Sequence, residues 1–349
     1  MRHLLQWCLC LVVLRAHDLP NDRCTGQHGT ICPVEDGVNY PRGARKCYAN
    51  WIFLGTMRSG TSTLAHKLGQ HPHIQFFHHN SQGHINVKGA EEDSWLLKDH
   101  NISDRSRYFE RLPCIAEGMN SSSYILGHYK PSYYLFDRLI PQRLRSFFPN
   151  AAALKFVVMV RDPVEARFSL FASSRIEDEG TFDALAAREI NESTSYSECV
   201  LAQLSGGALA SSADAISDRC GHASQHVELQ DFIYHVYLRR WMYGSFFKAT
   251  NFHIISDKEF NDSPLKLLHD TVEFLGADPD AFEELYLRNH FENSINPFAA
   301  ASRLNALRVR KNVNTQREHM STQTAYALRS FYQPHNALLY GLVRRDLQL

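Results

Sequence analysis

Three short, nearly uninterrupted apolar runs divide the body of the chain. They are residues 48–55, 154–160 and 252–256, and the first two lead directly into segments with helical periodicity. A continuous apolar run is typical of a strand in a parallel sheet that is buried on both faces. Parallel strands need helical crossovers, which then cover the sheet. The pattern therefore predicts an α/β protein with a central parallel sheet flanked by helices.

The covering helices are expected where apolar residues recur at helical spacing. No internal repeat is visible, so residues 48–349 are expected to form a single domain, preceded by a Cys-containing stem or lead-in at 17–47. Two stretches rich in small or polar residues, 71–89 and 205–220, are predicted to be loops. The predicted helices are 63–69, 133–148, a stretch that begins at Asp162 or Pro163 and runs through Phe171, 229–247, 265–275 and 322–342, the last interrupted around Pro334.

The overall charge changes this picture little. The chain has 37 Lys and Arg and 37 Asp and Glu among 349 residues, so its formal net charge is zero. No general electrostatic field draws it to nucleic acid or to an acidic membrane, and an anion site must be local. No nucleic-acid partner is therefore expected. The 19 histidines form no H-E-x-x-H motif and no Cys/His cluster, so no metal is expected either.

The N-terminus and the cysteines indicate the secretory pathway. The apolar run Met1–Leu14 fits the core of a signal peptide, with cleavage near Ala16, so residues 1–16 are expected to be a signal peptide or a short signal-anchor. A buried N-terminal helix is the other alternative. Any membrane contact is expected only through such an anchor. Cys199 and Cys220 bracket a small-residue stretch and are a candidate disulfide. N-glycosylation sequons occur at Asn101, Asn120, Asn191 and Asn261.

The segment Leu54–Leu68, LGTMRSGTSTLAHKL, has the features of a phosphate-binding strand–loop–helix. Gly55 and Gly60 permit tight turns and close backbone approach, and the N-terminus of the following helix attracts an anion. It is not an ATP-type P-loop, because Thr61 stands where that motif requires Lys. An ordinary Gly/Ser turn is the alternative if the segment is considered alone.

A second segment, Lys155–Ser169, KFVVMVRDPVEARFS, places Arg161 at the end of a buried strand and Ser169 eight residues later. If a helix starts at Asp162 or Pro163, Ser169 lies about two turns inside it. These two side chains could together bind a second phosphate.

The two segments together resemble the PAPS-dependent sulfotransferases, and most closely the Golgi carbohydrate branch (heparan- and chondroitin-type). The resemblance extends from about Trp51 to Val343 and includes FHIISDKEFNDSPLKLLHDTVEFLG at 252–276 and FYQPHNALLY at 331–340. It implies the sulfotransferase fold, a P-loop-like domain, and PAPS as co-substrate without a metal. It also implies that Arg58 stabilises charge on the leaving sulfuryl group. The implied contacts with the 5′-phosphate are Ser59, Gly60, Thr61 and Ser62, and those with the 3′-phosphate are Arg161 and Ser169. The resemblance also suggests, with less support, that Arg310 and Lys311 cover the nucleotide. For these two residues a solvated charged surface is an equally good interpretation.

The catalytic base departs from the family pattern. Many Golgi members carry Glu-Lys-x-Pro-x-Tyr, whereas this chain has HYKPSY at 128–133. Alignment on Pro131 puts His128 at the Glu position and moves the Lys to Lys130, so both are catalytic candidates. A structural His128 is the alternative, and His78, His79 and Glu117 are substitutes.

The resemblance implies transfer of a sulfuryl group to a hydroxyl of a carbohydrate acceptor, on a polysaccharide or a glycoprotein glycan, in the Golgi lumen or after secretion. Two alternatives remain open at this point. The acceptor could be a protein tyrosine or a small alcohol, or the chain could be an inactive nucleotide-binding homologue, since the expected Glu is absent.

Overall fold

The structure of the chain is a computed structural model, and the account below concerns part of its length. The described residues are 23–25, 31–33, 48–76, 125–129, 135–149, 151–173, 181–205, 216, 219–220, 228–243, 247–281 and 320–349.

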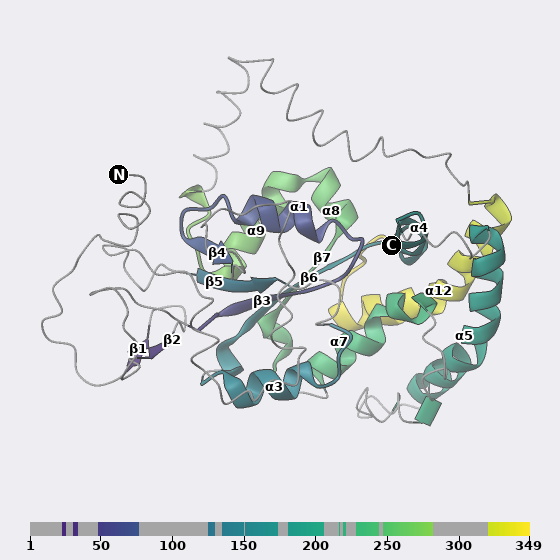
Figure 1. Ribbon diagram of the computed structural model, residues 1–349, viewed down its shortest axis with the longest axis horizontal. Coiled ribbons are helices and arrows are strands. Elements are labelled where there is room, and N and C mark those ends of the chain that lie inside the picture. The colour runs from purple at the N-terminus through teal and green to yellow at the C-terminus, as the bar shows by residue number, and fades with distance from the viewer. Residues whose placement is uncertain are drawn as a thin grey trace, which may run out of the picture.

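A five-stranded sheet forms the centre of the molecule (Figure 1). All four pairings between neighbouring strands are parallel, which confirms the predicted α/β class. The three central strands are almost completely buried, as the apolar runs predicted for two of them, at 51–55 and 155–160. In spatial order the strands are β4 (Ile74–Phe76), β5 (Ile125–Tyr129), β3 (Trp51–Gly55), β6 (Lys155–Val160) and β7 (Phe252–Ser256).

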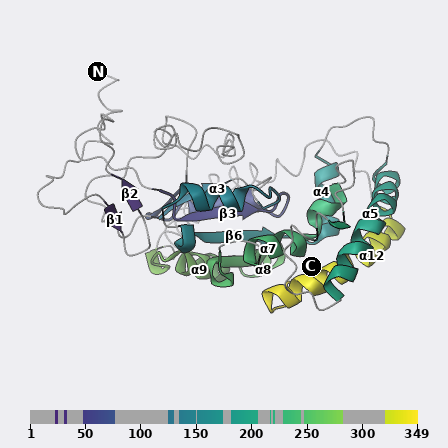
Figure 2. The same cartoon turned by 90° about the horizontal axis from the view of Figure 1, so that it is seen from below.

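Helices cover both faces of the sheet (Figures 1 and 2). Because side chains alternate along a strand, Trp51 and Phe53 of β3 point to one face and Ile52 and Leu54 to the other. The first face packs against α1 (Thr61–Leu68), α8 (Asp257–Asp262) and α9 (Pro264–Leu275). The second face packs against α3 (Ile140–Phe147) and α7 (Tyr234–Met242).

The remaining long helices gather at the right of Figure 1, beside the carboxyl ends of the strands. They are α4 (Pro163–Phe171), α5 (Phe182–Ser205) and α12 (Thr322–Val343). Among the described residues, short 3₁₀ turns connect the main elements; these are η2 (Ala151–Ala153), η3 (Glu228–Phe232) and η4 (Ala249–Asn251).

Local sequence explains where the helices nearest the strand ends begin. Asp162 caps α4, its Oδ1 accepting from the amide of Val164 at 2.8 Å, and Pro163 occupies the first helical position, where no amide hydrogen is needed. Ser256 caps α8 by accepting from the amide of Glu259 at 3.1 Å. Both caps lie at the end of a strand, so the chain turns into a helix at the same edge of the sheet each time.

A buried ion pair joins α4 to α5. Arg167 donates through Nε and Nη2 to the two carboxylate oxygens of Glu189, both at 2.8 Å, and the two side chains are only 1% and 7% exposed. Arg167 also lies 3.1 Å from Glu228 of η3. Such a bidentate pair fixes the relative position of two helices, because either charge left alone in the interior would be costly.

The predicted Cys199–Cys220 disulfide is present, with an S–S distance of 2.08 Å. It ties the end of α5 to the segment that follows. None of the helices in the described part of the chain combines the length and apolar character needed to cross a membrane.

Several expectations about single elements were wrong. Strand β4 lies inside the predicted loop 71–89, and helix α3 is half the predicted length of 133–148. The last helix continues through Pro334 without interruption. The sequence patterns missed β5, α5 and the two-stranded antiparallel sheet of β1 (Arg23–Thr25) and β2 (Ile31–Pro33) in the lead-in.

A buried chain of two histidines links α5, α7 and α12. His335 shares a hydrogen bond with Ser197 at 2.7 Å through Nε2 and with His235 at 2.9 Å through Nδ1. Burial lowers the pKa of His335 to about 4. The pKa of His235 is lowered by burial, by His335 and by Arg239. Both rings are therefore neutral in the folded protein near neutral pH.

This pair predicts a loss of stability in mild acid. Because both pKa values are lower in the folded protein, the unfolded chain binds more protons than the folded one below about pH 6.5. The free energy of unfolding therefore decreases as the pH is lowered through this range. For His335 alone, the free energy of unfolding should drop by about 2 kcal/mol between pH 6.5 and pH 5. Urea titrations at both values should show this drop, and in a His335→Gln variant the drop should be smaller by about 2 kcal/mol. It should not vanish, because His235 and His253 also have lowered pKa values. The exposed His269→Gln is the control, and an unchanged drop in His335→Gln would contradict the assignment.

Candidate active site

The loop between β3 and α1 forms a concave turn at the carboxyl end of the central strand. Gly60 stands at the N-cap of α1 with φ of 90°, a left-handed conformation that glycine adopts without strain. A Cβ at this position would come within 3.3 Å of the Met159 side chain. Thr56 anchors the start of the loop, since its amide and its hydroxyl both donate to the carbonyl of Met159, at 2.7 and 3.1 Å. The left-handed conformation therefore favours glycine at position 60, and an added Cβ would also require the flexible end of the Met159 side chain to shift slightly.

The N-terminus of α1 is suited to an anion. No side chain caps the helix and its first turn holds no acidic residue. The first amides of a helix have no partner within it, so those of Thr61 and Ser62 are available to phosphate oxygens. Ser59 is buried, and its hydroxyl donates to the carbonyl of Thr56 at 2.6 Å, which supports the turn from inside. The predicted cradle residues 59–62 thus lie together, with Ser59 in a supporting position.

Tyr129, at the end of β5, orders the hydroxyls of this cradle. Its Oη lies 2.9 Å from Oγ of Ser62 and 3.5 Å from Oγ1 of Thr61. The tyrosine ring packs edge-on against Phe53 in the face of the sheet below α1. A rigid aromatic side chain therefore fixes the direction of two hydroxyl groups that could bind a phosphate.

Arg58 lies at the rim of the loop in a left-handed conformation, with φ of 62°. Its Nη2 donates to Oγ of Ser173, just after α4. Partial burial lowers the pKa of its guanidinium, which nevertheless stays charged at neutral pH. Arg58 is therefore a cation that can reach an anion held on the loop by exchanging its contact with Ser173.

Arg161 extends from the end of β6 and joins the second motif to the first. Its Nη1 donates to the carbonyl of Arg58 at 3.1 Å. Its Nε lies 3.2 Å from Asp257, and its Nη2 lies 3.4 Å from Glu165. Ser169 is half-buried in α4, two turns after Arg161, as predicted. The structure thus brings the two phosphate motifs to the same edge of the sheet.

The base candidate His128 does not lie with these residues. It pairs in register with Ile52, and its ring is fully buried edge-on against Phe148, on the face that α3 covers. Tyr129, the next residue, points to the opposite face, toward α1. A general base must reach the acceptor hydroxyl, and a side chain with no exposed surface does not. Base function for His128 is therefore not supported by this geometry, and it stays a prediction.

Other predicted residues lie outside the described part of the chain. These are Lys130, Arg310 and Lys311 of the site, the substitutes His78, His79 and Glu117, and the sequons at Asn101 and Asn120. The sequon residues Asn191, on α5, and Asn261, on α8, are exposed. Within the described residues, no group of three His, Cys, Asp or Glu side chains could hold a metal ion.

Three residues of the site were missed in the sequence. Asp257 follows β7 in the segment SDKEF, and its acidic character after a strand was the only signal of an ion pair with Arg161. Tyr129 lies next to the expected base His128, and no sequence pattern marks its contact with Ser62 and Thr61. Tyr234, fully buried at the start of α7, lies against Thr56 and the backbone of Arg161, and burial raises its pKa. Recognising each one requires knowing which strands are neighbours.

The fold and the site together define an α/β protein with two candidate phosphate-binding segments at the carboxyl edge of a parallel sheet. No protein-family model matches the chain. The membrane-associated sulfotransferase kil1 of Dictyostelium discoideum is 28% identical over 145 residues, which are 42% of this chain and 26% of that protein. The matched segment thus spans about a quarter of its relative. This similarity supports the resemblance to sulfotransferases.

Two solved structures were also compared with the chain. A sulfotransferase from Alicyclobacillus acidocaldarius aligns over 86% of this chain and 97% of its own, with 18% identity and a TM-score of 0.47. The sulfotransferase domain from the curacin biosynthetic pathway aligns over 66% of this chain and 74% of its own, with 13% identity and a TM-score of 0.32.

Proposed function

We propose that the chain transfers a sulfuryl group from PAPS to a hydroxyl of a carbohydrate acceptor in the secretory pathway. The observation that carries this proposal is the contact between the two phosphate motifs, where Arg161 Nη1 donates to the carbonyl of Arg58 at 3.1 Å. PAPS carries a 5′-phosphosulfate and a 3′-phosphate, so its donor end and its ribose phosphate need two adjacent anion sites. The disulfide Cys199–Cys220 supports an oxidising compartment.

In this proposal each part of the loop has a separate task. The amides of Thr61 and Ser62 and the hydroxyls ordered by Tyr129 hold the 5′-phosphate, while Arg161 and Ser169 hold the 3′-phosphate. The acceptor oxygen attacks sulfur as the bond between sulfur and the bridging phosphate oxygen breaks. Negative charge then develops on the phosphate, and Arg58 stabilises it electrostatically. The acceptor proton passes to a general base.

A second function is favoured by one observation. His128 is fully buried on the face away from α1, so the chain could bind the nucleotide without turnover. Such a homologue would act as a nucleotide-binding protein of the endomembrane system.

Radiolabelled transfer assays test both functions. Folded protein should be incubated with [³⁵S]PAPS and a panel of glycosaminoglycans, glycoprotein glycans, tyrosine peptides and small alcohols. Binding of adenosine 3′,5′-bisphosphate should be measured in parallel by calorimetry. Label in a glycan supports the proposal, and label in a peptide or an alcohol only would replace the acceptor class. Tight bisphosphate binding without any transfer would support the second function.

A further inference from the structure

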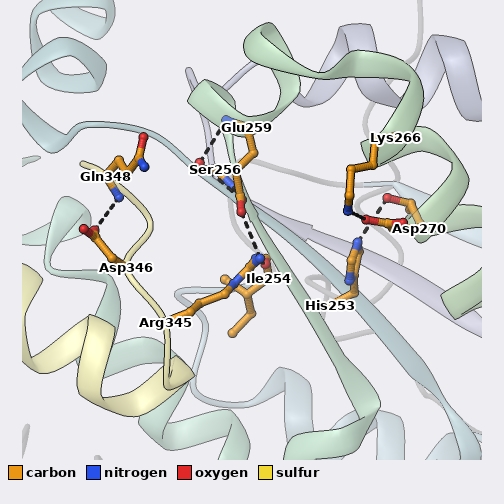
Figure 3. Close-up of polar contacts among 10 residues, drawn as sticks. His253, Ile254, Ser256, Glu259, Lys266, Asp270, Arg345, Asp346 and Gln348 are labelled. Carbon is orange, nitrogen blue, oxygen red and sulfur yellow. Dashed lines mark hydrogen bonds and ion pairs between the residues drawn. The ribbon is translucent and has the colours of Figure 1, made fainter.

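The C-terminal tail folds back over the edge strand of the sheet (Figure 3). After α12 ends, Arg345 donates through Nη2 to the carbonyl of Ile254 in β7 and through Nη1 to Glu259 of α8 at 2.9 Å. Leu347 is fully buried, and the amide of Leu349 donates to Oη of Tyr340 at 2.8 Å. The tail therefore has a fixed position against β7 and α8.

Glu259 joins this tail to the start of α8. One carboxylate oxygen, Oε2, accepts from the amide of Ser256 at 2.8 Å and lies 3.3 Å from its hydroxyl, which completes the helix cap. The other oxygen, Oε1, accepts from Arg345. A single carboxylate thus holds the cap and the tail together, as Figure 3 shows.

The capped end of α8 also contacts the candidate nucleotide site. Asp257 is the first residue of α8, and its Oδ2 lies 3.2 Å from Nε of Arg161. Arg161 in turn donates to the carbonyl of Arg58. Contacts therefore run without a gap from Arg345 through Glu259 and the α8 cap to Asp257, Arg161 and the anion loop.

We propose that Asp257 and Arg345 are positioning residues that orient Arg161 for the 3′-phosphate of the nucleotide. This inference rests on the proposed function. Asp257 holds the Nε side of the guanidinium and Nη1 donates to the carbonyl of Arg58, which leaves Nη2 and the second hydrogen of Nη1 for phosphate oxygens. The other carboxylate on Arg161, Glu165, is 47% exposed against 21% for Asp257. The phosphate therefore displaces Glu165, and Asp257 stays in place.

The expected effects follow from burial and position. Arg345 and Glu259 are both more than a third exposed, so their ion pair contributes little to global stability. Its contribution is to the orientation of α8. Mutations along a network of this kind change the coupling between sites by a few-fold to about thirtyfold. Loss of Arg345 should accordingly weaken binding of a 3′-phosphate by about three- to tenfold.

Calorimetry with two nucleotides tests this inference. Dissociation constants of adenosine 3′,5′-bisphosphate and adenosine 5′-phosphate should be measured for wild type, Arg345→Met and Arg344→Met. Arg344 is the matched control, because its side chain is exposed and makes no hydrogen bond or ion pair among the described residues. We expect Arg345→Met to weaken the bisphosphate about three- to tenfold and to leave the monophosphate unchanged. Arg344→Met should change neither.

Two carboxylate variants test whether each carboxylate beside Arg161 helps or hinders binding of the 3′-phosphate. Asp257→Asn should weaken the bisphosphate selectively, whereas Glu165→Gln should bind it as tightly as wild type or more tightly, since it removes a competitor. The double variant Glu259→Gln with Arg345→Met should lose no more affinity than the worse single variant, because both break the same link. Should Arg345→Met fold poorly, Arg345→Lys replaces it, since Lys lacks the fork that reaches both Ile254 and Glu259.

The outcomes separate the two proposals. A wild-type protein that does not prefer the bisphosphate overturns the proposed function and this inference together. A wild-type protein that does prefer it, with the same preference in Arg345→Met and in Asp257→Asn, overturns the inference alone. An equal loss in Arg344→Met also overturns it, because the effect would then belong to the tail's charge and not to its contacts.

Discussion

Replacing Arg58 with alanine is expected to lower the rate of sulfuryl transfer by about 10²- to 10³-fold, the usual effect of removing one group that stabilises charge in a transition state. Arg58 is the cation at the rim of the anion loop, and Ser173 holds it close by in the structure described. A positive charge at this point acts most strongly when the bond between sulfur and phosphate breaks. The change should therefore appear mainly in kcat, measured with [³⁵S]PAPS and the acceptor that the panel identifies.

Two variants control for causes other than charge. Arg58→Lys keeps the cation and the left-handed backbone, so it should retain a large part of the activity that Arg58→Ala loses. Ser173→Ala removes the resting contact of Arg58 without removing its charge, and it should leave kcat within about threefold of wild type. If Arg58→Ala transfers sulfate at the wild-type rate, the role assigned to Arg58 is wrong.

The central strands could be predicted because their signal is local. β3 and β6 are continuous apolar runs. Because both faces of these strands are buried, apolar and polar residues do not alternate along them, and the runs are easy to recognise in the sequence. β5 has the sequence ILGHY, in which glycine and histidine break the apolar pattern. Its identity as a strand depends on the neighbours that enclose it. That information lies in tertiary packing, which a single-sequence pattern does not contain.

Pro334 shows a similar limit at the end of the chain. A proline inside a helix usually weakens it, so an interruption was the reasonable prediction. Yet α12 is packed on both sides of the proline, with Tyr332 and His335 almost fully buried. The Tyr332 hydroxyl donates to the carbonyl of Leu229 at 2.8 Å. Tertiary contacts on each side of the proline therefore stabilise the helix. These contacts cannot be predicted from the sequence of the helix alone.

The residues of the candidate site likewise fall into those that the sequence could predict and those that it could not. Residues 59–62 and Arg161 could be found because glycines, hydroxyls and a strand-end cation occur at characteristic spacing along the chain. Asp257 could not be found from the sequence, because its ion pair with Arg161 depends on β6 and β7 being neighbouring strands. His128 illustrates the opposite situation. Alignment on a motif gave it a role, while the period of two along β5 turns its side chain to the face away from α1.

Gly127 in β5 is a position where a single added methyl group should have a large effect on folding. It pairs in register with Trp51 of β3, whose side chain is fully buried. A Cβ built on Gly127 would overlap the indole ring of Trp51. The indole cannot move aside easily, since it also packs edge-on against Phe76 with ring centroids 5.0 Å apart. Gly127→Ala is therefore expected to lower the free energy of unfolding by about 3 kcal/mol, the upper part of the range for overpacked cores.

Gly341 supplies the matched control, because it lies exposed in α12 and a Cβ there would meet nothing within 4 Å. Gly341→Ala should raise the free energy of unfolding by about 0.5–1 kcal/mol, as alanine favours the helix over glycine. Urea unfolding of both variants and of wild type measures the difference. The cause can be isolated in a Trp51→Leu background, where the smaller side chain leaves room and Gly127→Ala should cost clearly less. An equal cost in both backgrounds would mean that the strain at Gly127 comes from the backbone of β5 and not from the indole that lies against it.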